Sequence, residues 1–209
     1  MKEKYIKFGL SFQVPSEVSK KAITLSKELG SKNKAKFILD GQNFYPHLTI
    51  YPPHYPAENL PKIINSVEGI IQDAGVIKMV FSEVGSKNGY VAIYFQLTPE
   101  IKALHKNLVE VLNPFREGYI NPKYSEAAKM ERFTSQEIVN IKDYGYPYVM
   151  DCYYHPHLSL IRLEDVEQAK AVINDVEWNI KEFKVDKLIL HRIGDNGGAI
   201  EVIKEFNLN

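Results

Sequence analysis

Two short stretches of the sequence share a pattern of residues that could do chemistry. The first is YPHLTIY, residues 45–51, and the second is HPHLSLI, residues 155–161. Each contains Pro-His-Leu followed by a hydroxyl residue and an aliphatic residue, and the second histidine lies 110 positions after the first. The repeated pattern supplies two imidazoles, His47 and His157, and two hydroxyl groups, Thr49 and Ser159.

The alternation of residue types predicts that each stretch is a β-strand. Residues i and i+2 of a strand share a face, so His47 and Thr49 point the same way, as do His157 and Ser159. The leucine between them points into the core of the protein. If the two polar faces meet, they form a cleft that holds two imidazoles and two hydroxyl groups.

This set of groups suits the cleavage of a phosphodiester without a metal ion. A neutral imidazole can take a proton from water, and a protonated one can give a proton to the leaving oxygen, because the pKa of histidine lies near working pH. The hydroxyl groups of Thr49 and Ser159 can donate hydrogen bonds to the non-bridging phosphate oxygens, where charge accumulates. The residue types leave open which histidine is the base and which is the acid.

The composition limits the class of protein. A chain of 209 residues suits one domain with a sizeable core, and 26 basic residues balance 26 acidic ones. No global field then draws the protein to nucleic acid or to a membrane, so we expect any RNA substrate to be an end or a single linkage. Cys152 is the only cysteine, which rules out an internal disulfide. We expect a soluble, cytoplasmic monomer without a membrane partner, since no signal peptide or apolar run of about 20 residues is present.

The order of predicted elements is repeated along the chain. The predicted strands cover residues 5–15, 44–51, 76–85, 90–97, 152–163, 183–194 and 199–207, and the predicted helices cover residues 16–30, 57–75, 98–112, 134–145 and 164–176. Each motif strand is followed by a helix and a hairpin. Gly85 and Gly89 in the first hairpin correspond to Gly194 and Gly198 in the second at an offset of 109, which indicates an internal duplication.

The duplication predicts an α+β fold of two pseudo-symmetric lobes around a central cleft. Each lobe is expected to be an antiparallel sheet with flanking helices. The whole chain, 1–209, would be a single bilobal domain, with duplicated halves of roughly 1–98 and 99–209 and an irregular insertion at about 113–150.

The motifs PHLTI and PHLSL resemble the paired His-x-Thr/Ser signature of the two-histidine (2H) phosphoesterase superfamily. That superfamily includes 2′,3′-cyclic nucleotide phosphodiesterases and 2′-5′ RNA ligase-like proteins. The resemblance implies catalytic roles for His47 and His157, phosphate-binding roles for Thr49 and Ser159, and no cofactor. Residues 135–163 are also similar to the approach to the second motif in a branch linked to phosphonate metabolism, which would suggest a small ribose phosphate as substrate.

Three further residues are candidates for substrate binding. Tyr45 and Tyr51 are expected on the face that carries His47, where a tyrosine could stack on a base or simply line the wall of the cleft. His155 is expected on the same face as His157, where it could line the cleft or orient its neighbour.

A metal site is the alternative role for the His-Pro-His stretch. His155 could supply one ligand, with His54 or Cys152 as further ligands. Two ligands do not make a site, so we expect no metal. His54, His105 and His191 are each expected to be structural or exposed.

The remaining candidates are less specific. Arg162 would face away from Ser159 if its strand were regular. The irregular segment could be a recognition element or a surface excursion packed on its own aromatic residues. Its mixed basic and aromatic residues are Arg116, Tyr119, Tyr124, Arg132 and Phe133.

The sequence therefore predicts a metal-independent phosphodiesterase that opens a cyclic phosphodiester, with a 2′,3′-cyclic phosphate of a nucleotide or RNA end as substrate. Two alternatives stay open. One is a hydrolase of a small, non-nucleotide cyclic ribose phosphate, and the other is a non-catalytic module that binds RNA ends or phosphate. RNA ligation, the same chemistry with an RNA hydroxyl in place of water, is also compatible with the motifs.

Overall fold

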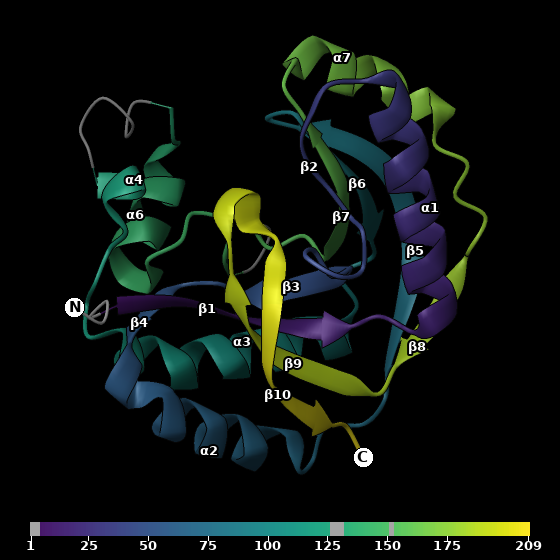
Figure 1. Cartoon of the computed structure of the whole chain (residues 1–209). Coiled ribbons are helices and arrows are strands. Elements are labelled where there is room, and N and C mark those ends of the chain that lie inside the picture. The colour runs from purple at the N-terminus through teal and green to yellow at the C-terminus, as the bar shows by residue number, and fades with distance from the viewer. Residues whose placement is uncertain (1–4, 126–131, 151–152) are drawn as a thin grey trace.

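The two motif strands lie next to each other at the centre of one antiparallel sheet (Figure 1). The computed structural model describes residues 5–125, 132–150 and 153–209. Along the sheet the strand order is β10-β9-β1-β3-β7-β6-β5-β8, with β2 paired to β7 and β4 paired to β1. The strands are β1 (Tyr5–Gln13), β2 (Ala35–Ile38), β3 (His47–Tyr51), β4 (His54–Pro56), β5 (Ile77–Lys87), β6 (Tyr90–Phe95), β7 (His157–Leu163), β8 (Glu182–Val185), β9 (Lys187–Ile193) and β10 (Ala199–Asn207).

Most of the helices lie along the outer side of the curled sheet (Figure 1). The α-helices are α1 (Ser16–Lys32), α2 (Leu60–Ile71), α3 (Pro99–Leu112), α4 (Pro122–Ser125), α6 (Ser135–Tyr144) and α7 (Val166–Ala171). Short 3₁₀ helices are η1 (Ala57–Asn59), η2 (Asn113–Arg116), η4 (Val172–Asp175) and η5 (Asp195–Gly197). Helix α1 packs on β7 and α7 on β5 and β6, whereas α2 contacts β10 and α3 contacts β3. The predicted α+β class with helices flanking an antiparallel sheet is confirmed.

The sheet mixes strands from both halves of the chain. Strands β5 and β6 follow the first motif, but β6 pairs with β7 of the second, and β9 follows the second motif but pairs with β1. The predicted strand at 183–194 is divided at Asp186, because β8 pairs with β5 and β9 pairs with β1 at the other side of the sheet. In the part of the chain that the structure describes, no helix has both the length and the hydropathy of a membrane span.

The core lies between the sheet and its helices. Leu48 and Leu158, which face each other across β3 and β7, are fully buried there. Fully burying a leucine side chain stabilises a fold by about 1.5–3 kcal/mol. The residues on either side of each leucine point to the opposite face of the sheet. We call this opposite face, which carries His47, Thr49, His157 and Ser159, the motif face.

Both motif strands contain a β-bulge directly after the hydroxyl residue. Thr49 pairs with Ser11, but Tyr51, two residues on, pairs with Leu10, the adjacent residue of β1. A bulge of this kind inserts one extra residue and reverses which face the following side chains occupy. As a result Tyr51 points into the core, where its side chain is 1% exposed. The expectation that Tyr51 lies beside His47 on the motif face is therefore wrong.

The same distortion occurs in β7. Ser159 pairs with Ala92, and Ile161 pairs with Val91, so two residues of β7 match one step of β6. Ile161 is fully buried and Arg162 is half-buried. The reversed alternation brings Arg162 onto the motif face, which corrects the expectation drawn from a regular strand.

The buried position of Tyr51 gives a testable consequence. Its hydroxyl donates to the carbonyl oxygen of Tyr144 at 2.7 Å and also lies 3.0 Å from Oδ1 of Asn113. Tyr51→Phe should lower the free energy of unfolding by about 1–3 kcal/mol, because it leaves the buried carbonyl oxygen of Tyr144 without this donor. Urea denaturation would measure the change.

A matched control is Tyr55→Phe. Tyr55 is equally buried, but its hydroxyl has no hydrogen-bond partner among the described residues. This variant should be neutral or slightly stabilising. A Tyr51→Phe variant as stable as Tyr55→Phe would contradict the hydrogen-bonded, buried position of the Tyr51 hydroxyl.

Candidate active site

The paired leucines bring the two motif histidines close together. Because Leu48 pairs with Leu158 in an antiparallel register, His47 and His157 lie diagonally across this contact. The Cα atoms of diagonal neighbours in such a pair are about 7–8 Å apart, so both imidazoles rise from the same part of the motif face. The structure thus brings together the residues of both motifs on one face.

Each imidazole is oriented by a carbonyl group two residues earlier. Nδ1 of His47 lies 2.8 Å from the carbonyl oxygen of Tyr45, and Nδ1 of His157 lies 2.8 Å from that of His155. A carbonyl oxygen can only accept, so both Nδ1 atoms carry the hydrogen. Nε2 of each neutral ring is left as the nitrogen that can exchange a proton with a ligand. The proline before each histidine keeps the preceding residue extended and so favours this bond.

The surroundings of both histidines favour the neutral form. Burial is the main cause that lowers the pKa of His47 to about 4, while the bond to Tyr45 opposes this shift and a charge on His157 adds to it. Burial also lowers the pKa of His157, and charges on His155 and Lys87 contribute in the same direction. A bound anion would offset this repulsion and allow one ring to hold a proton.

The hydroxyl residues stand beside the histidines. Thr49 and Ser159 are half-buried on the motif face. The backbone of Thr49 is held by Tyr154, whose hydroxyl donates to the Thr49 carbonyl oxygen at 3.2 Å. The side chains of both hydroxyl residues lie on the motif face together with the two imidazoles.

Arg162 is a candidate functional residue that a regular strand pattern hides. Its Nη1 donates to Oδ1 of Asn196 at 2.7 Å, and its guanidinium lies 4.8 Å from the centre of the Tyr90 ring. Its Nε is buried without a hydrogen-bond partner in the described structure. A fixed cation with an unused donor, on the same face as Ser159, is suited to a phosphate oxygen.

Two rings next to the motif histidines cannot be placed from the sequence pattern. The imidazole of His191 lies 5.0 Å from that of His47, and the Tyr94 ring lies 5.6 Å from that of His157. The sequence predicts that His191 is either structural or exposed near a hairpin, and the structure excludes exposure, because His191 is fully buried on the motif face. Only the pairing of β9 with β1, which is distant in sequence, reveals its position.

Tyr45 and His155 lie close to the motif histidines through their backbone. Tyr45 is half-buried and forms a bridge with Ala199, and its carbonyl group accepts from His47. His155 is exposed, and its carbonyl group accepts from His157. Contact of either side chain with a substrate remains a prediction.

The basic and aromatic residues of the central segment divide into two groups. Arg116 is buried, and its guanidinium donates to the carbonyl oxygens of Tyr119, Lys142 and Asp143, so it fixes the end of α6. The others make aromatic contacts: Tyr119 with Tyr5, Tyr124 with Phe133 and Tyr146, and Arg132 with Phe133. The structural role of Arg116 follows from its hydrogen bonds.

The proposed metal ligands do not form a cluster in the described residues. His54 contacts Asn121, with 3.2 Å between its Nε2 and Nδ2 of the asparagine, and Cys152 lies outside the described residues. Across 5–125, 132–150 and 153–209, no three His, Cys, Asp or Glu side chains are grouped to hold a metal ion.

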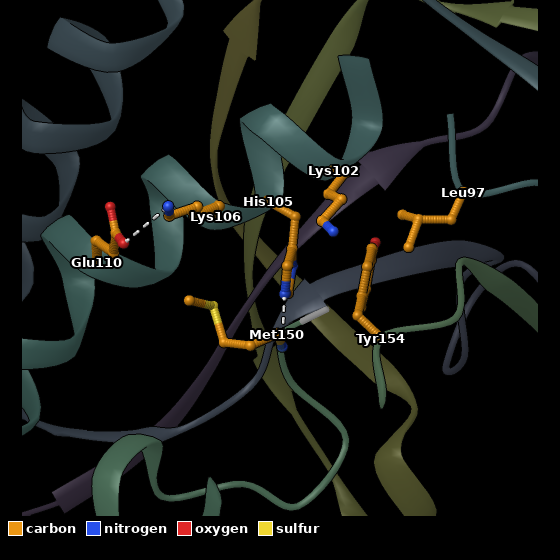
Figure 2. Close-up of a pocket in the computed structure, with 7 residues that line it drawn as sticks. All are labelled: Leu97, Lys102, His105, Lys106, Glu110, Met150 and Tyr154. Carbon is orange, nitrogen blue, oxygen red and sulfur yellow. Dashed lines mark hydrogen bonds and ion pairs between the residues drawn. The ribbon is translucent and has the colours of Figure 1, made fainter. Parts of the chain in front are cut away.

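Two cavities lie near these elements. Figure 2 shows one of about 220 Å³ between α3 and the segment that leads to β7, lined by Leu97, Lys102, His105, Lys106, Glu110, Met150 and Tyr154. His105 is buried there and stacks on Tyr154 at 3.7 Å. This cavity does not contain the motif residues, but Tyr154 links its wall to Thr49. A second cavity of about 370 Å³ lies beside the N-terminal end of β1, and Lys7, His54 and Arg192 are among its lining residues.

The lowered pKa values predict how stability depends on pH. His47 and His191 are neutral in the folded protein down to a pKa of about 4 and about 3, whereas an unfolded histidine has a pKa near 6.5. Between these values the unfolded chain binds more protons, so the free energy of unfolding should fall as the pH is lowered from about 6.5 towards 4. Each histidine can contribute up to about 1.4 kcal/mol per pH unit.

Urea denaturation at pH 7, 6, 5 and 4.5 would measure this slope. In His191→Gln the slope should be smaller, whatever the stability of the variant at pH 7. A wild-type protein whose stability is constant or increases on acidification through this range would contradict the buried neutral state.

Comparison with known proteins agrees with this architecture. A family model described as a protein of unknown function, DUF1045, matches residues 49–194, which is more than two thirds of the chain. No curated protein sequence matches.

Solved structures with the same fold cover nearly the whole chain at low sequence identity. LigT of E. coli in its apo form has a TM-score of 0.58 and 12% identity over 99% of both chains. LigT complexed with 3′-AMP has a TM-score of 0.57 and 12% identity over 98% of this chain and 99% of that one. TT0787 of Thermus thermophilus has a TM-score of 0.57 and 15% identity over 97% and 98%. The chain belongs to the DUF1045 family, and its fold is that of the 2H phosphoesterases.

Proposed function

We propose that the protein is a phosphodiesterase that opens a cyclic phosphodiester by general acid–base catalysis with His47 and His157. The observation that supports this most strongly is the symmetrical arrangement of the two imidazoles. Each has its Nδ1 fixed by a backbone carbonyl group, and the two lie diagonally across the Leu48–Leu158 contact. Two rings held in this way leave two Nε2 atoms to exchange protons with one bound phosphodiester.

The reaction needs both histidines in opposite protonation states. One neutral imidazole takes a proton from water as the water oxygen bonds to phosphorus. The bond from phosphorus to one ring oxygen breaks, and the other imidazole, which is protonated, gives its proton to that leaving oxygen. The product is a phosphate monoester next to a free hydroxyl group. Proton exchange with solvent then restores the starting state of the two rings.

Hydrogen bonds to the non-bridging oxygens would stabilise the transition state. Thr49 and Ser159 can each donate one, and Arg162 adds a positive charge with an unused Nε donor. Charge increases on these oxygens during attack, so donors positioned beforehand lower the barrier more than they tighten substrate binding.

The preferred substrate is a nucleoside 2′,3′-cyclic phosphate or an RNA end that carries one. LigT, which shares the fold, has been solved with phosphate and with 3′-AMP, a nucleotide with a phosphate on its ribose. The balanced net charge of the chain favours a small ligand over a long duplex. A small cyclic ribose phosphate is the second candidate, because the same histidines would open it and because of the likeness of residues 135–163 to the phosphonate-linked branch.

Hydrolysis of a panel of nucleoside 2′,3′-cyclic phosphates in excess chelator tests the proposal. Wild-type turnover should survive chelation. His47→Ala and His157→Ala should each lower kcat about 10²–10⁴-fold, the usual range for one acid–base group. Thr49→Ala and Ser159→Ala should lower kcat by up to roughly 10²–10³-fold. His54→Gln is the matched control, a half-buried histidine bonded to Asn121 outside the motifs, and it should retain activity.

The other outcomes identify the alternatives. Turnover of a cyclic ribose phosphate but of no nucleotide would select the second substrate class. Tight binding without product, unaffected by His47→Gln or His157→Gln, would indicate a binding module. Activity that is lost on chelation would contradict the acid–base mechanism and favour a metal site.

A further inference from the structure

A third histidine is built into the motif face next to His47. His191 lies on β9 opposite Gly9 of β1, and its imidazole centre is 5.0 Å from that of His47. It has no exposed surface. Figure 1 shows β9 and β1 side by side below the motif strand β3. The two histidines therefore contact each other although 144 positions separate them in the chain.

Both nitrogens of His191 are engaged. Nδ1 lies 3.1 Å from the carbonyl oxygen of Arg192, so Nδ1 donates. Nε2 lies 2.8 Å from Oγ of Ser11, and in the neutral ring Nε2 accepts from this hydroxyl. Ser11 is also fully buried and pairs with Thr49. A chain of contacts thus runs from Thr49 and Ser11 through His191 to His47.

The backbone beside His191 leaves space for its ring. A Cβ atom on Gly9 would lie 2.8 Å from Cε1 and 2.9 Å from Nε2 of His191, so the imidazole would have to shift if any other residue stood at Gly9. Burying a polar ring and a hydroxyl group costs free energy that their hydrogen bonds must offset. A pair of apolar side chains of the same shape could be as stable or more stable, so packing alone does not require this polar pair.

The two motif histidines have different neighbours. His47 is 9% exposed and packs on the neutral ring of His191. His157 is more exposed and packs on Tyr94. Burial, the charge of His47 and the charge of Lys7 lower the pKa of His191 to about 3, so this ring stays neutral in the working range.

The charged and titratable groups around the pair come from four strands. They are Lys7 on β1, His157 on β7, Arg192 on β9 and Glu205 on β10, whose carboxylate accepts from Gln13. None of them forms a carboxylate–imidazole pair with His47 or His191 among the described residues, so neither ring has a carboxylate partner there to stabilise a positive charge.

We propose that Ser11 and His191 are positioning residues that hold His47 as the neutral, Nδ1-protonated ring, so that His47 is the general base and the more exposed His157 is the general acid. This inference rests on the proposed phosphodiesterase function. It assigns the two roles that the near-symmetry of the motifs leaves open. It also accounts for a buried polar pair at a place where packing alone does not require one.

Two esters with different leaving groups test the assignment. Hydrolysis of a nucleoside 2′,3′-cyclic phosphate expels a ribose alkoxide, which needs a proton from the general acid. Hydrolysis of the p-nitrophenyl ester of a nucleoside 3′-phosphate expels p-nitrophenolate, which is stable without that proton. The fold decrease in kcat caused by His157→Ala should be at least ten times larger for the cyclic substrate than for the p-nitrophenyl ester. His47→Ala should decrease kcat by the same factor for both esters.

Ser11→Ala and His191→Phe should behave as His47→Ala does, with a smaller effect. Both should lower kcat roughly 10- to 100-fold on either ester, since a misplaced catalytic ring costs factors of this size, and leave KM within about twofold. Ser26→Ala is the matched control, because Ser26 is also fully buried and makes two hydrogen bonds, to Leu39 and Leu160, away from the motif face. It should change stability but leave kcat within about twofold.

Nitrogen NMR of the imidazoles in the free protein gives a readout that does not depend on turnover. In the wild type His47 should remain the neutral Nδ1-protonated tautomer down to about pH 4. In Ser11→Ala and His191→Phe, the other tautomer of His47 should appear. An unchanged tautomer of His47 in both variants would overturn the positioning role.

The two proposals fail in different ways. Absence of wild-type turnover on both esters contradicts the phosphodiesterase function, while the tautomer seen by NMR still decides whether Ser11 and His191 control His47. Turnover with a selective loss of the cyclic substrate in His47→Ala, rather than in His157→Ala, would reverse the roles and overturn the assignment.

Discussion

The antiparallel pairing of Leu48 with Leu158 is the contact on which the candidate site depends. Both leucines are fully buried between the sheet and its helices, so the register of the two strands is fixed by the core. A shift of one residue would expose both leucines and bury the histidines on the wrong face. The energy of hydrophobic burial on one side of the sheet thereby positions the polar groups on the other side.

The pattern of the two motifs is sufficient to predict this arrangement in outline. Alternation within PHLTI and PHLSL predicts which residues share a face, and the repeat predicts that the two strands serve one site. The backbone path after each hydroxyl residue could not be predicted, because a β-bulge has no signature in these residues. The bulges send Tyr51 into the core and bring Arg162 to the motif face. The place of His191 could not be predicted for another reason: its neighbours come from β1, at the other end of the chain.

The electrostatics of the motif face favour neutral imidazoles. Burial lowers the pKa of His47 and of His157, and each ring would be destabilised further by a charge on its neighbours. In the proposed reaction, a bound phosphodiester would bring a negative charge to this face, so the substrate itself would help to create the acid that protonates its leaving group. Hydrogen bonds from Nδ1 to backbone carbonyl groups keep both Nε2 atoms directed to the same ligand.

The dependence of kcat/KM on pH, measured with a nucleoside 2′,3′-cyclic phosphate in excess chelator, tests the two-histidine account most directly. This ratio reports the pKa values of the free enzyme. The base must be neutral, so the rate should rise as the pH passes through about 4, and the acid must be protonated, so the rate should fall as the pH passes through the lowered pKa of the second histidine. The account predicts a bell-shaped curve with its maximum between about 4 and 6.5. A rate that increases steadily through neutral pH, or that disappears with the chelator, would contradict it.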